Sequence, residues 1–489
     1  MGELYRNAVS FNINKIDIPV NTGFKPLLKS EIQAVFDVDS VIYNTDKEKL
    51  FFAKHNKTWL FRKLFFEDFV SVREKDFTLS INPLFYLQYG KTDSNSYFIN
   101  TRGIEIKGNI GKNLSYYSSF RENQAKFRSY IYDWAWNRLI VPGQGALKKS
   151  NTDKSIYDFS SASGYLSYTP FNWLNIQAGQ AKNFIGEGHR SLFLSDNAMN
   201  YPFAKFSFSY KNFKYVSMFT QFSDFENVYY SYHFKKHGAF NYLSYNYKNR
   251  IELGLFEGLI YRTTDTSEYY NRFPADYFIP VTGVRTVVNG FAGENNALAG
   301  INIKIKLTDF IQAYGQYAID DPKQKKYAYQ VGMKIFDVLH SKMKNLQWYF
   351  QAEYNVASPR TYSHAYLKYQ TWTHYNQELA TPFGADFAEI FLTSNITYKN
   401  FLLNVSFNKI TLNKHGTFSD VYMLDNFTYL MMPDQEIISH KTITISYILN
   451  RRTDLQIYAG ADIRTTDNSD ENFIMVGLRT SLSNFYYDF

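Results

Sequence analysis

Hydrophobic and polar residues alternate with a period of two along most of this chain. In residues 301–307, for example, isoleucine and leucine at odd positions alternate with Asn302, Lys304 and Lys306 at even positions. The same alternation recurs over residues 77–88, 104–110, 403–408 and 442–447. It predicts β-strands with one apolar face and one polar face. The chain contains no run of about 20 apolar residues, which a membrane-spanning helix would need.

Seventeen successive connections between these stretches are alternately long and short. Four of the short ones share a Lys-Asn pair, at residues 111–114, 210–213, 247–250 and 398–401. Asparagine tolerates the positive φ that tight hairpins require, and lysine keeps a turn in water. The long segments lie near 90–96, 123–157, 182–202, 223–236, 262–294, 320–326, 360–386, 412–437 and 464–471. Single-chain outer-membrane barrels place short turns in the periplasm and long loops outside.

These patterns predict an all-β fold, a transmembrane antiparallel β-barrel of about 18 strands. We expect the barrel to begin near Phe77 and to close with a strand through Ile474, Val476, Leu478 and Leu482, so that Phe489 is its terminal aromatic residue. A soluble all-β protein such as a propeller also alternates apolar and polar residues. The regular change between long and short connections, the terminal Phe489 and the lack of a repeating blade motif all favour the barrel.

Composition supports a membrane barrel. The chain of 489 residues has 42 Tyr and 44 Phe, and aromatic girdles mark the two interfaces of such barrels. It has no cysteine, which excludes disulfides and thiolate metal sites. The net charge of +8 is spread over turns and lumen positions instead of gathering beside exposed aromatics, so nucleic-acid binding is not expected.

Residues 1–76 precede the hairpins and form a predicted N-terminal segment, whereas residues 77–489 form the predicted barrel. Between Lys57 and Val72, apolar residues recur at helical spacing and predict a short amphipathic helix. This helix could plug the lumen or cap the periplasmic rim, and the pattern does not choose between the two. No signal peptide precedes Glu3, so we expect the sequence to be that of a mature, exported chain.

The long segment between residues 183 and 202 is the candidate lumen-constricting loop. Its two glycines allow tight folding, and its charged residues suit a lumen wall; the loop either folds inward to narrow the channel or caps the barrel through internal hydrogen bonds. We expect Glu187 and Arg190 to lower the cost of holding each other in a narrow lumen. The candidate residues of this loop are Gly186, Glu187, Gly188, His189, Arg190, Ser191, Ser195 and Asn197.

Aromatic residues crowd two other long loops and are candidates for binding a glycan or a partner protein. An alternative is that they form the upper aromatic girdle of the barrel. The candidates are Tyr130, Tyr132, Trp134 and Trp136 in the second long loop, and Tyr366, Tyr369 and Trp372 in the seventh.

Catalysis is not expected. His189, Ser191 and Asp196 lie in one loop, and residues two or five apart in a loop rarely place a base against a nucleophile with a third orienting group. No paired histidine spacing predicts a metal site, and no motif predicts a cofactor.

The loop at 183–202 also carries a family resemblance. Gly186-Glu187-Gly188, Ser191-Leu192, Leu194-Ser195, Asn197-Ala198 and Pro202 resemble the pattern of the Wzi family of capsule-assembly outer-membrane proteins. The chain is more similar still to the RemB-type gliding-motility proteins of Bacteroidetes, relatives of that family. This similarity covers residues 59–65, 100–103, 122–125, 141–145 and 182–186.

The resemblance implies an 18-stranded, non-enzymatic barrel in the bacterial outer membrane, surrounded by lipid and lipopolysaccharide. It implies a role in cell-surface organisation, in gliding motility or with surface adhesins, the type IX secretion machinery or other outer-membrane proteins. A Wzi-like protein that binds surface polysaccharide is the alternative, and a substrate-selective porin is a third.

Overall fold

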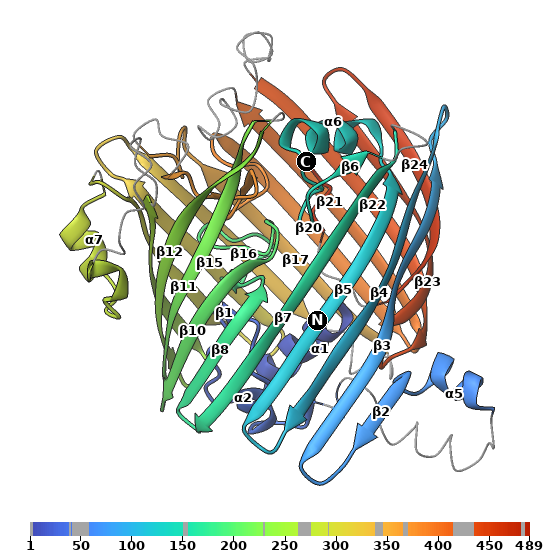
Figure 1. Cartoon of the computed structure of the whole chain (residues 1–489), viewed down its shortest axis with the longest axis horizontal. Helices are drawn as coiled ribbons and strands as arrows, with labels where there is room; N and C mark the ends of the chain where they lie inside the picture. Colours follow the sequence, from blue (N-terminus) through green and yellow to red (C-terminus); the bar gives the residue numbers. More distant parts are fainter. Residues whose placement is uncertain are drawn as a thin grey trace.

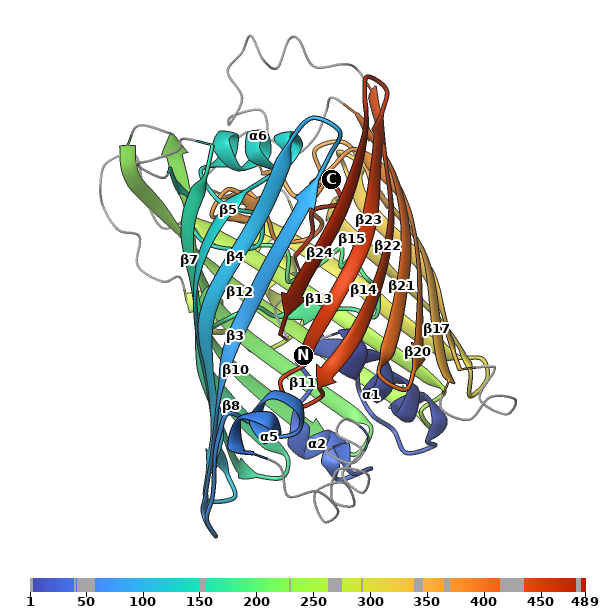
Figure 2. The same cartoon turned by 90° about the vertical axis from the view of Figure 1, so that its right-hand side faces the viewer.

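A computed structural model describes residues 3–38, 41, 58–149, 155–227, 230–262, 275–291, 293–337, 346–364, 370–413, 435–480 and 485–489. In this part of the chain, 18 antiparallel strands form a closed barrel (Figures 1 and 2). Each strand pairs with its neighbours in chain order, and the last strand pairs with the first. The predicted fold class is therefore confirmed.

The barrel strands are β3 (Phe77–Lys91), β4 (Ser96–Ile110), β5 (Leu114–Lys126), β7 (Tyr157–Phe171), β8 (Leu174–Ala181), β10 (Tyr201–Tyr210), β11 (Phe213–Asn227), β12 (Tyr230–Tyr247), β13 (Ile251–Arg262), β14 (Asn296–Lys306), β15 (Ile311–Asp321), β16 (Lys326–Phe336), β17 (Leu346–Ala357), β20 (Phe387–Tyr398), β21 (Phe401–Asn413), β22 (Gln435–Asn450), β23 (Leu455–Thr466) and β24 (Asp470–Arg479).

Short strands and helices lie inside the barrel or at its margins. The short strands are β1 (Phe24–Lys25), which pairs with β9 (Phe184–Ile185); β2 (Val70–Arg73), which pairs with β3; β6 (Lys148–Lys149), which pairs with β7; and β18 (Thr373–His374), which pairs with β19 (Gln377–Glu378). The helices are α1 (Glu3–Lys15), α2 (Lys29–Gln33), α5 (Trp59–Phe65), α6 (Ser129–Arg138), η1 (Ala275–Phe278) and α7 (Val284–Asn289). None of the helices described here is both long and apolar enough to cross a membrane.

Alternation along the strands separates an outer apolar face from a polar lumen. On β14, the side chains of Ile301 and Ile303 are 47% and 36% exposed on the outer face, whereas Lys304 and Lys306 are buried on the inner face. The same holds on β22, where Ile443 and Ile445 are exposed outside. The predicted faces of these strands are therefore correct.

The short turns lie at one end of the barrel, which faces the periplasm in outer-membrane proteins of this kind. Positive φ was expected at the asparagine of each Lys-Asn turn. The structure instead places it at Lys211 (54°) and Lys399 (53°), and at both Lys248 and Asn249 (50° and 52°). Lysine therefore adopts the left-handed conformation in three of the four turns, and in the turn at 111–114 Gly111 (60°) adopts it instead.

The last strand ends earlier than the sequence indicates. Strand β24 ends at Arg479, where it pairs with Tyr86 in the middle of β3, and Leu482 lies outside the described residues. Strand β2 pairs with the lower part of β3, from Val70 opposite Ile81 to Arg73 opposite Thr78. A covered edge offers fewer unpaired backbone groups to other chains. Phe489 does not end the last strand; it lies inside the barrel near α6 (Figure 2).

The amphipathic pattern at 57–72 forms a helix only over Trp59–Phe65, and none of its residues is buried. This helix, α5, lies at the short-turn end (Figures 1 and 2), where Asn450 at the end of β22 donates to the carbonyls of Lys63 and Glu67, both at 3.0 Å. The lumen is instead entered by α1, β1 and α2, which precede this pattern in the chain.

Candidate functional site

The periplasmic half of the lumen holds the N-terminal segment, residues 3–38. Its backbone carbonyls accept hydrogen bonds from asparagines of the wall. Asn249 Nδ2 donates to the carbonyls of Ile13 and Ile16, both at 2.8 Å, and Asn246 Nδ2 donates to that of Val20 at 2.8 Å. Asparagine side chains of the barrel thus supply hydrogen-bond donors to the backbone carbonyls of a segment that has little regular structure between its two helices.

The loop at 182–200 enters the lumen from the opposite end and meets this segment. Its strand β9 pairs with β1, and the Gly186 amide donates to the Gly23 carbonyl at 2.7 Å. Gly186 has a φ of +141°, and a Cβ at this position would lie 2.3 Å from Gln316 Nε2 on the wall. Only glycine allows this backbone to approach β15 so closely.

Glu187 joins the loop to the N-terminal segment and to the wall. Its carboxylate lies 3.6 Å from Lys25 Nζ and 3.7 Å from Lys334 Nζ, and it accepts a hydrogen bond from the Thr22 hydroxyl. Burial alone would raise the pKa of Glu187, but the positive charges of Lys25, Lys304 and Lys334 outweigh it and lower the pKa to about 2. Glu187 is therefore ionised at neutral pH.

Arg190 joins the loop to the wall and to the C-terminal tail, residues 485–489. Its Nη2 lies 3.0 Å from a carboxylate oxygen of Glu389 on β20 and 2.7 Å from Asp488. Glu187 and Arg190 were expected to neutralise each other. Each has other partners instead, because the loop runs between two oppositely charged regions of the wall.

The remaining candidate residues of the loop maintain its own fold. The Ser191 hydroxyl accepts from the amides of Phe193 and Leu194, and Ser195 accepts from the Asn197 amide. Asn197 Nδ2 donates to the Glu378 carbonyl at 2.9 Å. Gly188 approaches the wall, since a Cβ there would lie 2.5 Å from Glu353. These contacts hold the loop in place through bonds within it and to neighbouring segments.

His189, Ser191 and Asp196 are engaged separately. The His189 ring stacks on Phe391 at 3.8 Å between centroids, Ser191 donates to the Ile185 carbonyl, and Asp196 accepts from the Tyr486 hydroxyl. The loop does not assemble them as nucleophile, base and orienting acid. In the part of the chain that the structure covers, no three His, Asp or Glu side chains form a metal-binding group.

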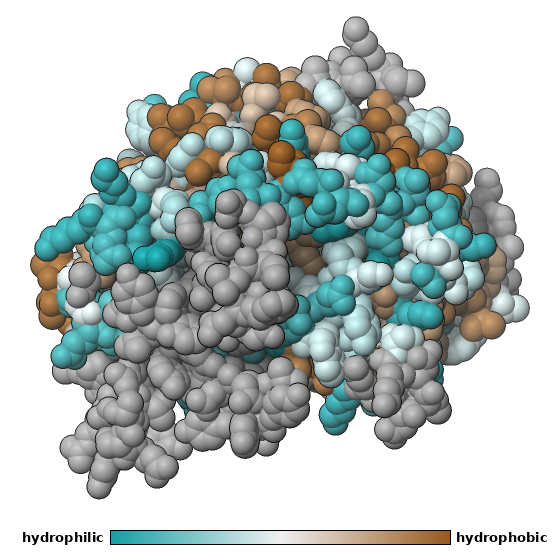
Figure 3. Space-filling model, turned by 90° about the horizontal axis from the view of Figure 1, so that it is seen from above, coloured by the Kyte–Doolittle hydropathy of each residue, from teal (hydrophilic) through white to brown (hydrophobic). Residues whose placement is uncertain are grey.

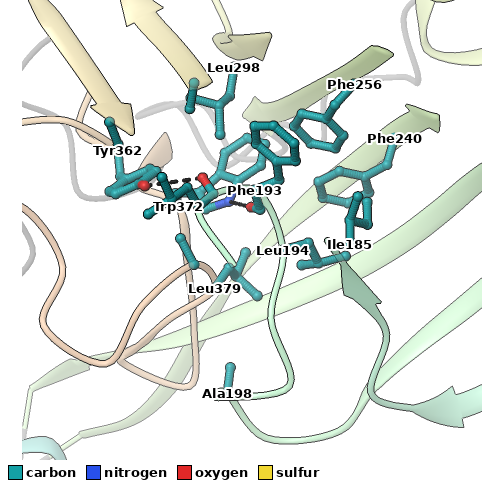
Figure 4. Close-up of a cluster of buried hydrophobic side chains, with 14 of the residues drawn as sticks. Ile185, Phe193, Leu194, Ala198, Phe240, Phe256, Leu298, Tyr362, Trp372 and Leu379 are labelled. Atoms are coloured by element: carbon teal, nitrogen blue, oxygen red, sulfur yellow. Dashed lines mark hydrogen bonds between the residues drawn. The ribbon is translucent and has the colours of Figure 1, made fainter. Parts of the chain in front are cut away.

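An apolar cluster fills the outer half of the lumen (Figure 4). Phe193 from the loop stacks on Phe256 at 4.6 Å, and Trp372 packs edge-on against Phe240 at 5.5 Å. Trp372 is fully buried, and its indole N–H donates to the Phe193 carbonyl at 2.7 Å. The described parts of the long connection between β17 and β20, residues 358–364 and 370–386, therefore fold inward as well.

A buried ion pair holds this second inward loop, and sequence reasoning missed it. Lys236 on β12 lies 2.6 Å from Asp224 on β11, and Asp224 also accepts from the Thr373 hydroxyl and the Asn376 amide. Both charged residues occupy even, lumen-facing positions of their strands. Opposite charges at such positions of neighbouring strands were the signal available in the sequence.

The candidate aromatics of the second long loop lie on α6, in the outer mouth. Tyr132 stacks on Tyr157 at 4.9 Å, while Tyr130 and Trp134 contact Phe489 at 5.7 and 5.3 Å. Trp136 is the most exposed of the four, at 39%. Of the candidates in the seventh loop, Trp372 is buried, and Tyr366 and Tyr369 lie outside the described residues. Seen from above, many of the coloured side chains toward the middle of the molecule are hydrophilic (Figure 3).

No protein-family model matches the chain, and no curated protein matches it by sequence. Among solved structures it is similar to Wzi, an outer-membrane protein involved in group 1 capsule assembly in Escherichia coli and described as a carbohydrate-binding β-barrel. That match has a TM-score of 0.60 and 13% identity, and it covers 99% of this chain and 98% of Wzi. At this identity the likeness shows the fold.

Two other outer-membrane barrels match less well. OccAB2 of Acinetobacter baumannii has a TM-score of 0.44 and 9% identity over 82% of this chain and 98% of its own. OprD of Pseudomonas aeruginosa has a TM-score of 0.42 and 8% identity over 85% of this chain and 100% of its own. The closed 18-strand barrel, apolar outside, identifies this chain as a protein of the bacterial outer membrane.

Proposed function

We propose that this protein is a closed, non-enzymatic outer-membrane barrel whose outer mouth binds a surface polysaccharide. The observation that carries the proposal is the filling of the lumen by four segments of the same chain. These are residues 3–38, the loop at 182–200, residues 358–364 with 370–386, and the tail at 485–489. Before the loop at 182–200 could leave the lumen, buried ion pairs such as that of Arg190 with Glu389 would have to separate, which is costly.

The outer end of α6 offers a surface suited to sugars. Trp136 is exposed beside Asp133 and Asn137, while Ile131 and Ala135 anchor the helix below. An aromatic ring next to hydrogen-bonding side chains can stack on a sugar face and bind its hydroxyls. The carbohydrate-binding Wzi barrel of E. coli has the same fold, which supports a polysaccharide as the ligand.

The test is binding of the purified protein to capsular or extracellular polysaccharide from the source bacterium, immobilised on a sensor surface. Trp136→Ala should weaken binding about 5- to 30-fold, a loss of about 1–2 kcal/mol as is usual for exposed aromatic contacts. Trp173→Ala is the matched control, because Trp173 is 50% exposed at the short-turn end. Equal binding by the two variants, or none by the wild type, would reject the proposal.

A second candidate is a role in surface organisation with gliding-motility or secretion proteins. It is favoured by α5, within the segment similar to RemB-type proteins, which exposes Trp59 and Leu60 by 54% and 56% at the periplasmic end. Exposed apolar residues of this kind anchor protein contacts. Cross-linking in native membranes should recover a periplasmic or outer-membrane partner with the wild type and lose it with Trp59→Ala/Leu60→Ala. Recovery of the same proteins with both would exclude α5 as the docking helix.

A further inference from the structure

The outward-facing rows of β12 and β13 include polar residues at positions where the alternation calls for apolar ones. Asn241 on β12 and Glu257 on β13 point outward, in the same rows as the lipid-facing residues of their strands. Leu253 and Leu255, on the same face of β13 as Glu257, are 43% and 40% exposed, yet Asn241 and Glu257 are fully buried. Something other than lipid therefore covers them.

The cover is the segment 275–291, which contains η1 and α7 and which we call the outer-wall flap. It lies outside the barrel, at mid-height of the wall in Figure 1, and α7 packs against β13 and β14. Tyr277 packs edge-on against Tyr261 at 5.3 Å and belongs to a buried cluster with Ala239 and Ala297 of the wall. Because residues 257–261 form the upper part of β13, the flap covers the half of the wall nearer the outer mouth.

Polar side chains of the wall bond to the backbone of the flap. Glu257 accepts from the Thr286 amide at 2.8 Å, Asn241 Nδ2 lies 3.4 Å from the Ile279 carbonyl, and the Tyr215 hydroxyl donates to the Pro280 carbonyl at 2.6 Å. Irregular backbone at membrane depth is tolerated only where protein satisfies its polar groups. The outward polar residues thus supply hydrogen-bond partners for the flap backbone, which allows the flap to lie against the wall within a membrane.

The other side of the flap is apolar and exposed. Its exposed side chains are Phe278 (58%), Val281 (51%), Val284 (36%), Val287 (83%) and Val288 (66%). The charged Arg285 points the other way and is fully buried, beside the ring of Phe219. This surface continues the lipid-facing rows of Leu253, Leu255 and Ile301.

We propose that the outer-wall flap is embedded in the outer membrane and that its apolar face contacts the acyl chains of the outer leaflet. Two observations favour lipid as the occupant over a protein. The apolar face is continuous with the lipid-facing wall, and the charged side chain of Arg285 is turned inward, away from that face. The flap contacts the lipid, and its hydrogen bonds to the wall satisfy backbone groups that would otherwise be unpaired within the membrane.

The test uses a bimane fluorophore on Val287→Cys, in full-length protein reconstituted into vesicles with brominated acyl chains. The natural chain has no cysteine, so each variant carries one label. Leu253→Cys on the wall is the lipid-facing control, and Lys323→Cys in an exposed outer turn is the aqueous control. We expect brominated lipid to quench Val287 and Leu253 within about twofold of each other, and aqueous iodide to quench Lys323 alone.

A second variant tests the role of the wall. Glu257→Ala removes the acceptor for the Thr286 amide and should increase iodide quenching at Val287, whereas Glu257→Gln keeps an acceptor oxygen and should not. If Glu257→Ala does not fold, the labelled Val287→Cys protein alone still decides the proposal. Quenching of Val287 by iodide as strong as that of Lys323 would overturn it. The proposal would also be overturned if Val287→Cys were exposed to iodide in vesicles but protected from thiol reagents on cells. That result would indicate a protein partner.

Discussion

The two halves of the lumen are filled by different chemistry, although the same strands form the wall of both. On β12–β14, the inward residues of the outer half include a group of large apolar side chains, such as Phe240, Phe256 and Leu298. Nearer the periplasm they are polar, such as Asn246 and Glu252. The outer half is packed as a hydrophobic core around Trp372, whereas the inner half docks the N-terminal segment largely by hydrogen bonds and ion pairs, with smaller apolar contacts beside them.

The comparison shows how one wall can hold two kinds of plug. The loops that fill the outer half are tied at both ends to barrel strands, so their apolar packing resembles that of an ordinary core. The N-terminal segment precedes the first barrel strand, and polar bonds that water can replace hold it beside a few ring contacts, such as Phe11 with Phe336 and Phe24 with Tyr242. We therefore expect the packed loops of the outer half to unfold only together with the barrel. The N-terminal segment should undock from the inner half while the barrel stays folded.

The largest expected effect is on the outer half. Trp372→Ala removes a fully buried ring and the donor to the Phe193 carbonyl, so it should lower the unfolding free energy by about 3–5 kcal/mol in urea titrations of the folded barrel. Trp173→Ala, at an exposed site, should change it by less than about 0.5 kcal/mol. Similar, small effects of both would mean that the outer half is loosely packed.

The second-largest effect should be on the docking of the N-terminal segment in the inner half, with no effect on the stability of the barrel. Asn249→Asp keeps the side-chain shape and the tolerance for positive φ, but it loses the donor to the carbonyls of Ile13 and Ile16. We expect faster hydrogen exchange in α1, equivalent to about 1–3 kcal/mol for two bonds, with an unchanged urea midpoint. Asn113→Asp, in another exposed short turn with a Lys-Asn pair, is the control. A fall in the urea midpoint for Asn249→Asp would show that the two halves are not independent.

The smallest effect should appear with acid. The folded pKa of Glu187 lies below its ordinary value of about 4.3, so its contribution to docking is present above that value and is lost as the pH falls towards about 2. Exchange of the β1 amides should therefore accelerate between these limits. In Glu187→Gln, the same amides should exchange faster already at neutral pH and show no further acid step from this group. An acid step of unchanged size in the variant would assign it to another carboxylate.

The wall of the barrel could be predicted from the sequence because its signal is local. A period of two places Ile303 outside and Lys304 inside whatever the rest of the chain does. The contents of the lumen depend on contacts between distant residues, such as Asn14 with the Asp309 carbonyl, and no local pattern encodes them. The loop at 182–200 was recognised by its glycines and charges, but not the partners of those charges. Outward polar residues such as Glu257 were a visible break in the alternation.

The measurement that tests the closed lumen most directly is single-channel conductance in planar bilayers, for the intact protein and for a variant lacking residues 187–195. That deletion removes the contacts of Glu187 and Arg190 and the ring of Phe193, while both flanking strands remain. We predict that the intact protein is almost silent and that the shortened one conducts. If the intact protein conducts like an open porin and the deletion changes nothing, the account of a chain-filled, closed barrel is wrong.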